Sequence, residues 1–157
     1  YGDHRDLHLS IRRQRQMCIR DSSYGIRSDK EALLFIADHF QLIPKIAKLV
    51  DEKFYHLDTC FQQLPTKNND AIFYPPAFED QSLSEFSDLF NLIPIHEDDA
   101  NQLACNAVVI NESVIFPSEN IEIIETVAQL GCNIEISNVS EFMKSGGACQ
   151  CLVITLQ

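Results

Sequence analysis

The sequence lacks the features that mark several common protein classes. No apolar run approaches the roughly 18 residues that a membrane-spanning helix requires. The adjacent glycines Gly146 and Gly147 lie at the wrong end of an expected strand and lack the G-x-G-x-x-G spacing of a phosphate-binding loop. The C-x-C pair of Cys149 and Cys151 has no second cysteine or histidine cluster at metal-ligand spacing beside it. We therefore expect no membrane span, no dinucleotide-binding loop, no metal site and no cofactor.

Positive charge is scarce as well. The formal net charge is -11 and the pI is about 4.7. This balance argues against nucleic acid and against an anionic membrane surface as the partner, because both repel an acidic protein. A cationic or neutral small molecule suits the charge better, although simple solubility also explains it. The oligomeric state is not indicated.

The cysteines are placed like core residues rather than like a disulfide framework. Most of the six lie inside apolar runs. Secreted disulfide-rich domains have the opposite pattern, so we expect reduced thiols and a cytoplasmic location. Cys60, Cys105 and Cys132 are expected to be small core residues. His96, within PIHEDD, is expected to lie in a solvated acidic loop rather than to act as a ligand.

The start of the chain differs in composition from the rest. All six arginines lie within the first 27 residues, whereas six lysines face twenty acidic residues from residue 28 onward. The first segment has no helical or strand period, and its RRQRQMCIRDS run resembles the translated adapter read-through found in metagenomic assemblies. We therefore expect residues 1–22 to be a non-native or disordered leader with few packed contacts, and residues 23–157 to form the fold. A basic arm that binds nucleic acid or lipid is the alternative.

The rest of the chain has the composition and periodicity of one globular domain. With 45% hydrophobic and 22% charged residues, it can bury a core of ordinary size. S-x-x-E capping boxes at Ser28 and Ser82 predict a helix over residues 28–40 and a second helix that ends before Pro94.

A repeated order of elements follows. A third helix is expected over residues 119–130, because Gly131 suits the C′ position. Strand, strand, helix and strand recur at about 45 residues, with Asp58, Ala104 and Ala148 at corresponding places. Such a period predicts an α/β fold of stacked or radially repeated modules. The expected strands are the short apolar runs 44–50, 56–64, 71–78, 106–111, 113–117, 132–136 and 149–156.

The run FYHLDTCFQQL combines strand-like apolar residues with polar residues at alternate positions. In an extended strand, side chains two residues apart share a face. His56, Asp58 and Cys60 are therefore predicted to form one polar stripe. A stripe of this kind is either a solvated edge or a functional site.

Five segments carry a resemblance to a known superfamily: YGIRSDKEAL, YHLDTCFQQL, AIFYPPAFED, LACNAVVIN and SEFMKSGGACQCL. In this order they resemble the C-terminal half of the guanidine-modifying enzymes, which include arginine deiminase, amidinotransferases and dimethylarginine dimethylaminohydrolase. The resemblance covers about residues 23–157 and looks closest to bacterial dimethylaminohydrolase-like and amidinotransferase-like members. It implies a pentein-like α/β propeller of five ββαβ modules, of which this chain would supply about three.

The resemblance also implies an activity. The expected enzyme is a dimethylarginine dimethylaminohydrolase-like hydrolase, which cleaves guanidino C–N bonds of arginine or methylated arginine through a covalent thiouronium intermediate. Arginine deimination or dihydrolysis, amidino transfer and a non-catalytic binding propeller are the alternatives. Because family members carry further substrate-binding acids in their first half, we expect the chain by itself to be a fragment with little or no activity.

Catalytic roles follow from the same resemblance. Cys151, just beyond the S-G-G motif, is the expected nucleophile, and Cys149, expected on the same strand face, is the alternative. His56 is expected to protonate the departing amine and then to help water cleave the intermediate. Asp58 is expected to hold the guanidinium by charge-assisted hydrogen bonds.

Four further residues complete the expected site. Gly146 and Gly147 would form a tight turn with its backbone close to the ligand. Arg27, in a Gly-x-Arg-Ser element, would position the substrate or a loop. Asn106 resembles a structural position of the superfamily and is expected to anchor a turn through hydrogen bonds.

Overall fold

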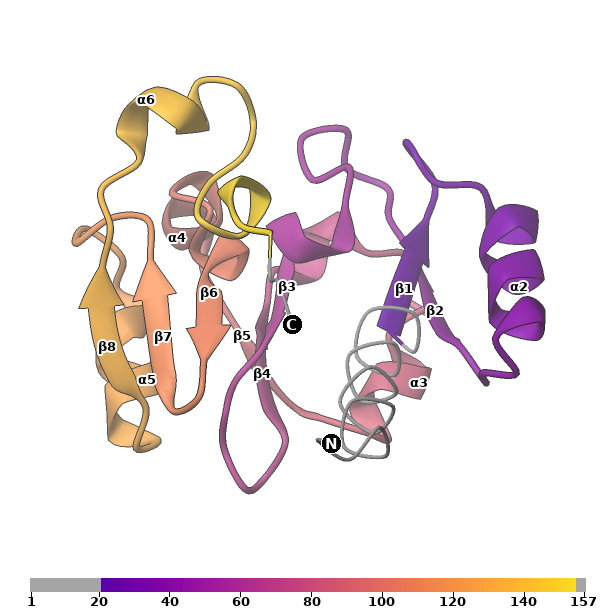
Figure 1. Ribbon diagram of the computed structural model, residues 1–157, viewed down its shortest axis with the longest axis horizontal. Coiled ribbons are helices and arrows are strands. Elements are labelled where there is room, and N and C mark those ends of the chain that lie inside the picture. Colours follow the sequence, from indigo (N-terminus) through magenta and orange to yellow (C-terminus); the bar gives the residue numbers. More distant parts are fainter. Residues whose placement is uncertain (1–20, 155–157) are drawn as a thin grey trace, which may run out of the picture.

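The computed structural model describes residues 21–154, which form three small sheets flanked by short helices (Figure 1). The first sheet pairs β1 (Asp21–Tyr24) in parallel with β2 (Lys45–Lys48), and α2 (Lys30–His39) connects the two strands. The expected leader lies outside the described residues, except that Asp21 and Ser22 belong to β1.

The second and third sheets share one strand order. In each, the first two strands are antiparallel, and the third strand returns through a helical connection to lie parallel to the second. The α/β class is therefore confirmed. The three sheets stay separate and open within residues 21–154, so these residues alone do not close a propeller. The elements are β3 (Phe61–Gln63), β4 (Asp70–Phe73), α3 (Ser84–Ser87) and β5 (Asn91–Pro94), then β6 (Val108–Ile110), β7 (Ser113–Phe116), α5 (Ile123–Gln129) and β8 (Asn133–Ile136).

Short helical turns join these elements and approach one another at the ends of the strands. The turn before β3 packs against the turn before β6. No helix among the described residues is long and apolar enough to cross a membrane. The short elements are α4 (Glu97–Asn101), α6 (Ser140–Met143) and the 3₁₀ turns η1 (Leu57–Thr59), η2 (Pro75–Ala77), η3 (Ala104–Asn106) and η4 (Gln150–Leu152).

The helix expected over residues 28–40 forms as α2, but its cap is one residue later than expected. Asp29, in an extended conformation, accepts a hydrogen bond from the backbone N–H of Ala32 at 3.1 Å. This bond lowers the pKa of the Asp29 carboxyl. Ser28 lies just before the cap, and its carbonyl closes the turn after β1 by accepting from Gly25 N–H at 3.0 Å.

The second predicted helix is much shorter than expected. Only α3 is helical, and the Ser82 hydroxyl donates to the Glu79 carbonyl at 2.8 Å instead of capping it. Phe86 and Phe90 are nevertheless buried, and each packs edge-on against Phe61, with ring centroids 5.2 and 5.3 Å apart. The helical spacing therefore correctly predicted that Phe86 and Phe90 are buried, although the helix itself is shorter than predicted and β5 follows soon after it.

The third predicted helix has the expected end. Gly131 follows α5 with φ +92°, and the N–H of Cys132 bonds back to the Val127 carbonyl. An L-residue with a side chain rarely adopts this left-handed conformation, so glycine suits the position.

One core contains residues of all three sheets and includes the expected cysteines. Cys60, Cys105 and Cys132 are all buried, which confirms their assignment as core residues. The Cys105 thiol donates weakly to the Ile72 carbonyl in β4, at 3.7 Å. The largest fully buried side chains are Phe54, Phe86, Phe116, Leu64 and Ile72. Because this packing is continuous, the turns at the ends of β3 and β6 are held on one rigid base.

Candidate active site

The predicted polar stripe does not form, because the chain turns where a strand was expected. Leu57–Thr59 is the 3₁₀ turn η1, and β3 begins only at Phe61. The turn is held by Thr59, whose hydroxyl and N–H both donate to the His56 carbonyl, at 2.6 and 3.0 Å. His56 is exposed and Asp58 is half-buried. Cys60 lies in the core instead of beside them.

Within the described residues, the last predicted strand begins with a turn, and this separates the two C-terminal cysteines. Cys149 precedes η4 and is buried, with its thiol donating to the Ser137 carbonyl at 3.8 Å. Cys151 lies within η4 and is exposed. A 3₁₀ turn has three residues per turn, so side chains two residues apart point to different sides. The expectation that both cysteines share a strand face is therefore wrong.

The structure brings Asp58 and Cys151 together from distant parts of the sequence. The Cys151 Sγ atom lies 3.8 Å from Asp58 Oδ2, which joins η1 to η4. Figure 1 shows the yellow C-terminal turn beside the magenta turn that precedes β3. A thiol and a carboxylate thus face each other at the ends of the second and third sheets.

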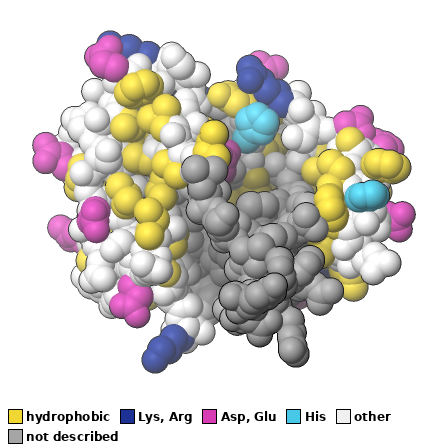
Figure 2. All heavy atoms as spheres, viewed as in Figure 1, with side chains coloured by type: hydrophobic (Ala, Val, Ile, Leu, Met, Phe, Trp, Pro, Cys, Tyr) yellow, Lys and Arg dark blue, Asp and Glu magenta, His cyan; other side chains and the backbone are white. Residues whose placement is uncertain are grey.

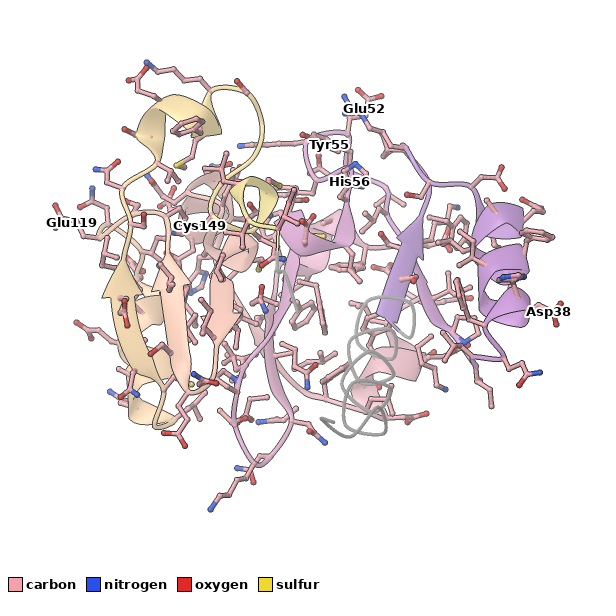
Figure 3. All side chains as sticks on the ribbon, in the orientation of Figure 1. Asp38, Glu52, Tyr55, His56, Glu119 and Cys149 are labelled. Carbon is pink, nitrogen blue, oxygen red and sulfur yellow. The ribbon has the colours of Figure 1, made fainter. Side chains whose placement is uncertain are left out.

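His56 lies at the start of the same turn as Asp58. Its ring makes an edge contact with the Tyr55 ring, with centroids 5.0 Å apart. Figure 3 shows both side chains on the upper side of the molecule, the same side as Cys149. In the same view, Figure 2 shows a histidine beside cationic side chains on this surface. His56 is therefore carried by the same turn as the carboxylate of the Asp58–Cys151 pair.

Tyr55, which the sequence did not single out, links Arg27 to the glycine turn. The Arg27 guanidinium lies 4.1 Å from the centroid of the Tyr55 ring, within cation–π distance. The Tyr55 hydroxyl donates to the Gly146 carbonyl at 3.0 Å. An aromatic residue directly before the H-x-D pair was the only signal in the sequence, and such a residue is more often part of the core.

The two glycines leave room that a larger residue would fill. A Cβ on Gly146, which has φ +85°, would lie 2.9 Å from the Tyr55 hydroxyl oxygen. A Cβ on Gly147 would lie 2.9 Å from the Cβ of Cys151 and 3.2 Å from its sulfur. The glycine turn thus packs directly on the candidate nucleophile.

Asn106 is fully buried and hydrogen-bonds to the backbone of both η1 and the Cys151 turn. It is therefore the hydrogen-bond anchor that the sequence predicted.

The surroundings of Cys151 favour its neutral form when no ligand is bound. Partial burial of the sulfur is the largest cause that raises the pKa of the Cys151 thiol, and the charge of Asp58 raises it further. A hydrogen bond with the Asn106 side chain acts in the opposite direction. A cation bound beside Asp58 would cancel the second cause and favour the thiolate.

Other surface features do not coincide with this site. A hollow of about 570 Å³ beside the β6–β7 turn is lined by residues such as Glu112 and Glu135, and none of the candidate residues lines it. Within residues 21–154, no three histidine, cysteine or acidic side chains gather closely enough to hold a metal ion.

Known proteins resemble most of the chain. No protein-family profile matches it. ArgZ, the bifunctional arginine dihydrolase/ornithine cyclodeaminase of Synechocystis sp., is 34% identical over 136 residues, which cover 85% of this chain and 19% of ArgZ. The N(G),N(G)-dimethylarginine dimethylaminohydrolase of Mycobacterium tuberculosis is 30% identical over 136 residues, which cover 86% of this chain and 44% of that enzyme.

The fold agrees with these alignments. The crystal structure of the N-terminal domain of an ArgZ variant, covalently bound to a reaction intermediate, superposes with a TM-score of 0.77 at 34% identity, covering 84% of this chain and 49% of that domain. The chain belongs to the guanidine-modifying superfamily. It spans less than half the length of both curated members named above.

Proposed function

We propose that this chain is part of a cysteine-dependent hydrolase that cleaves guanidino C–N bonds of arginine or methylated arginine. The observation that carries the proposal is the contact of 3.8 Å between Cys151 Sγ and Asp58 Oδ2. A carboxylate beside a thiol disfavours the thiolate unless a cation joins them. A guanidinium is such a cation, and its planar N–H groups can form two parallel hydrogen bonds with a carboxylate.

The first half of the reaction forms a covalent intermediate. The guanidinium binds Asp58 and lowers the pKa of the Cys151 thiol, which loses its proton to solvent. The thiolate attacks the central guanidinium carbon and forms a C–S bond. The C–N bond to the departing group then breaks, and His56 supplies the proton with which ammonia or an alkylamine leaves. Histidines titrate near pH 6.5, which suits an acid that must also act as a base.

The second half releases the product. His56, now neutral, takes a proton from water as that water attacks the carbon of the S-alkyl thiouronium. The C–S bond breaks, the proton of the added hydroxyl passes to the Cys151 sulfur, and a ureido product leaves. The ArgZ domain that superposes on this chain forms a covalent intermediate, which supports this route.

The remaining candidates take supporting positions. Arg27 contacts the Tyr55 ring, and the Tyr55 hydroxyl bonds to Gly146, so both residues would steady either the substrate or the glycine turn. Gly146 and Gly147 keep the backbone of that turn close to Cys151.

The proposal extends to the architecture. We infer that residues 23–157 form the C-terminal part of a pentein-like propeller. The expected leader is shorter than residues 1–22, because Asp21 and Ser22 pair with β2 and belong to the first sheet. The shared strand order of the second and third sheets supports repeated ββαβ modules. The five described cysteines are free thiols, which supports a cytoplasmic location.

The test is to trap the intermediate. The complete gene product is mixed with arginine or N(G),N(G)-dimethylarginine, quenched with acid and digested, and the Cys151 peptide is weighed by mass spectrometry. We expect a thiouronium adduct on Cys151 that accumulates in His56→Ala and is absent in Cys151→Ser. Turnover by Cys151→Ser at the wild-type rate would refute covalent catalysis.

The products distinguish the alternatives within the superfamily. Ammonia and citrulline indicate arginine deimination, dimethylamine indicates dimethylaminohydrolase activity, and ammonia with ornithine indicates dihydrolysis. A product that appears only when an amine acceptor is added indicates amidino transfer. Binding of arginine without any of these products indicates a non-catalytic binding protein.

A further inference from the structure

Asn106 connects the two turns that carry the proposed nucleophile and its carboxylate. It ends η3, and its side chain is fully buried at 0% exposure. Its Nδ2 donates to the Asp58 backbone carbonyl at 3.0 Å. Its Oδ1 accepts from the backbone N–H groups of Ala148 at 2.8 Å and of Cys151 at 3.3 Å. One side chain therefore fixes the backbone on both sides of the Asp58–Cys151 contact.

Only a carboxamide of this length fits all three bonds. An aspartate in the same position could still accept from Ala148 and Cys151 but could not donate to the Asp58 carbonyl. A leucine could make none of these bonds and would leave three buried backbone groups without partners. The need for both a donor and an acceptor at one buried point therefore accounts for the residue type.

We propose that Asn106 is the positioning residue of the site, and that it holds the Cys151 sulfur against the Asp58 carboxylate by fixing both turns. Asn106 itself does not touch the substrate. The kinetic consequence rests on the proposed function, whereas the effect on the thiol can be measured without any turnover. The hydrogen bond by which Asn106 lowers the pKa of the Cys151 thiol agrees with this role.

The test compares Asn106→Asp with a matched control, Asp99→Asn. Asp99 is also buried and accepts from two backbone N–H groups, those of Glu122 and Ile123, at 2.6 and 3.0 Å. The control therefore replaces a buried carboxylate with a carboxamide, whereas Asn106→Asp replaces a buried carboxamide with a carboxylate. Each protein is alkylated with iodoacetamide between pH 6 and pH 10, and modification of Cys151 is followed by fragmentation mass spectrometry.

We expect Asn106→Asp to shift the alkylation midpoint of Cys151 to higher pH, because a second carboxylate then adjoins the turn. At pH 8 its alkylation should be several-fold slower than in the wild type, whereas Asp99→Asn should follow the wild-type profile. In the complete gene product, kcat should fall by roughly tenfold to a hundredfold while KM changes by less than about threefold. A folded Asn106→Asp with the wild-type pH profile overturns the proposal.

A measurement on the wild type covers the case in which Asn106→Asp does not fold. We expect the amide hydrogens of Ala148 and Cys151 to exchange with solvent far more slowly than in an unstructured peptide of the same sequence. Exchange at the peptide rate at both positions overturns the proposal. Failure of the proposed function gives a different result, in which the alkylation profiles differ as expected but no guanidino compound is turned over.

Discussion

The buried core and the surface turn η4 give cysteine side chains opposite surroundings. In the core, burial raises the pKa of Cys60 and Cys105, and both residues are fully buried. On the surface, burial and the Asp58 charge raise the pKa of Cys151, but this residue is exposed to ligands. A bound cation can offset the Asp58 charge and lower the pKa of Cys151, whereas the pKa of the buried core thiols stays raised. Reactivity therefore depends on whether a ligand can change the surroundings of the thiol.

Replacing the sulfur of Cys149 or Cys151 with oxygen should give the largest difference between a buried and an exposed cysteine. Cys151→Ser should lower turnover of a guanidino substrate by on the order of a thousandfold or more, because a hydroxyl is far less ionised than a thiol. Cys149→Ser should keep most of the activity, since its thiol faces the Ser137 carbonyl. Steady-state assays of both variants decide the matter. The nucleophile is misassigned by two residues if only Cys149→Ser is inactive.

Closing the space beside the surface thiol should have the next largest effect. In Gly147→Ala, the new Cβ would lie 2.9 Å from the Cys151 Cβ, so the turn must shift. A displacement of about 1 Å at a nucleophile can cost roughly a hundredfold in rate, which is the expected size of the loss. The control Gly131→Ala meets no atom within 4 Å but has φ +92°, so it should cost stability rather than activity. Equal rate losses in the two variants would contradict the expectation.

The core thiols should make stability fall at alkaline pH. A buried thiol with a raised pKa stays neutral in the folded state, so its contribution is complete below the unfolded pKa of about 8.5 and is lost as the pH rises beyond it. The expected loss is about 1.4 kcal/mol per pH unit for each thiol. Urea unfolding between pH 7.5 and pH 9.5 measures the slope. Cys105→Ala should reduce that slope by more than Cys151→Ala does, and equal slopes would remove the distinction between the two regions.

Removing the carboxylate beside Cys151 should give the smallest effect of the four. In Asp58→Asn, the second cause of the raised pKa disappears while partial burial remains. The alkylation midpoint of Cys151 without substrate should therefore move to lower pH, although binding of a guanidinium weakens. Alkylation rates from pH 6 to pH 10 provide the check. A midpoint unchanged from the wild type would mean that the carboxylate does not act on the thiol.

Periodicity predicted the main elements because it reports which side chains are buried. The apolar spacing located α2, α5 and most of the strands, and Gly131 marked the end of α5 through its left-handed backbone. The boundaries near the site were wrong, since Thr59 holds a turn where alternation of polar and apolar residues suggested a strand. Alternation describes a pattern of burial that a compact turn can also produce.

The sequence by itself determined the alternation of strands and helices, the buried cysteines and, through its motifs, the residue types of the candidate site. These properties follow from local spacing and from the chemistry of individual side chains. Only the tertiary structure decided that the Cys151 sulfur lies against Asp58 while Cys149 is buried, and that Tyr55 supports the glycine turn. Asp58 and Cys151 are separated by 93 positions in the chain, and the two residues lie in different 3₁₀ turns, η1 and η4. No local pattern specifies such a contact, because its geometry is set by packing between distant segments.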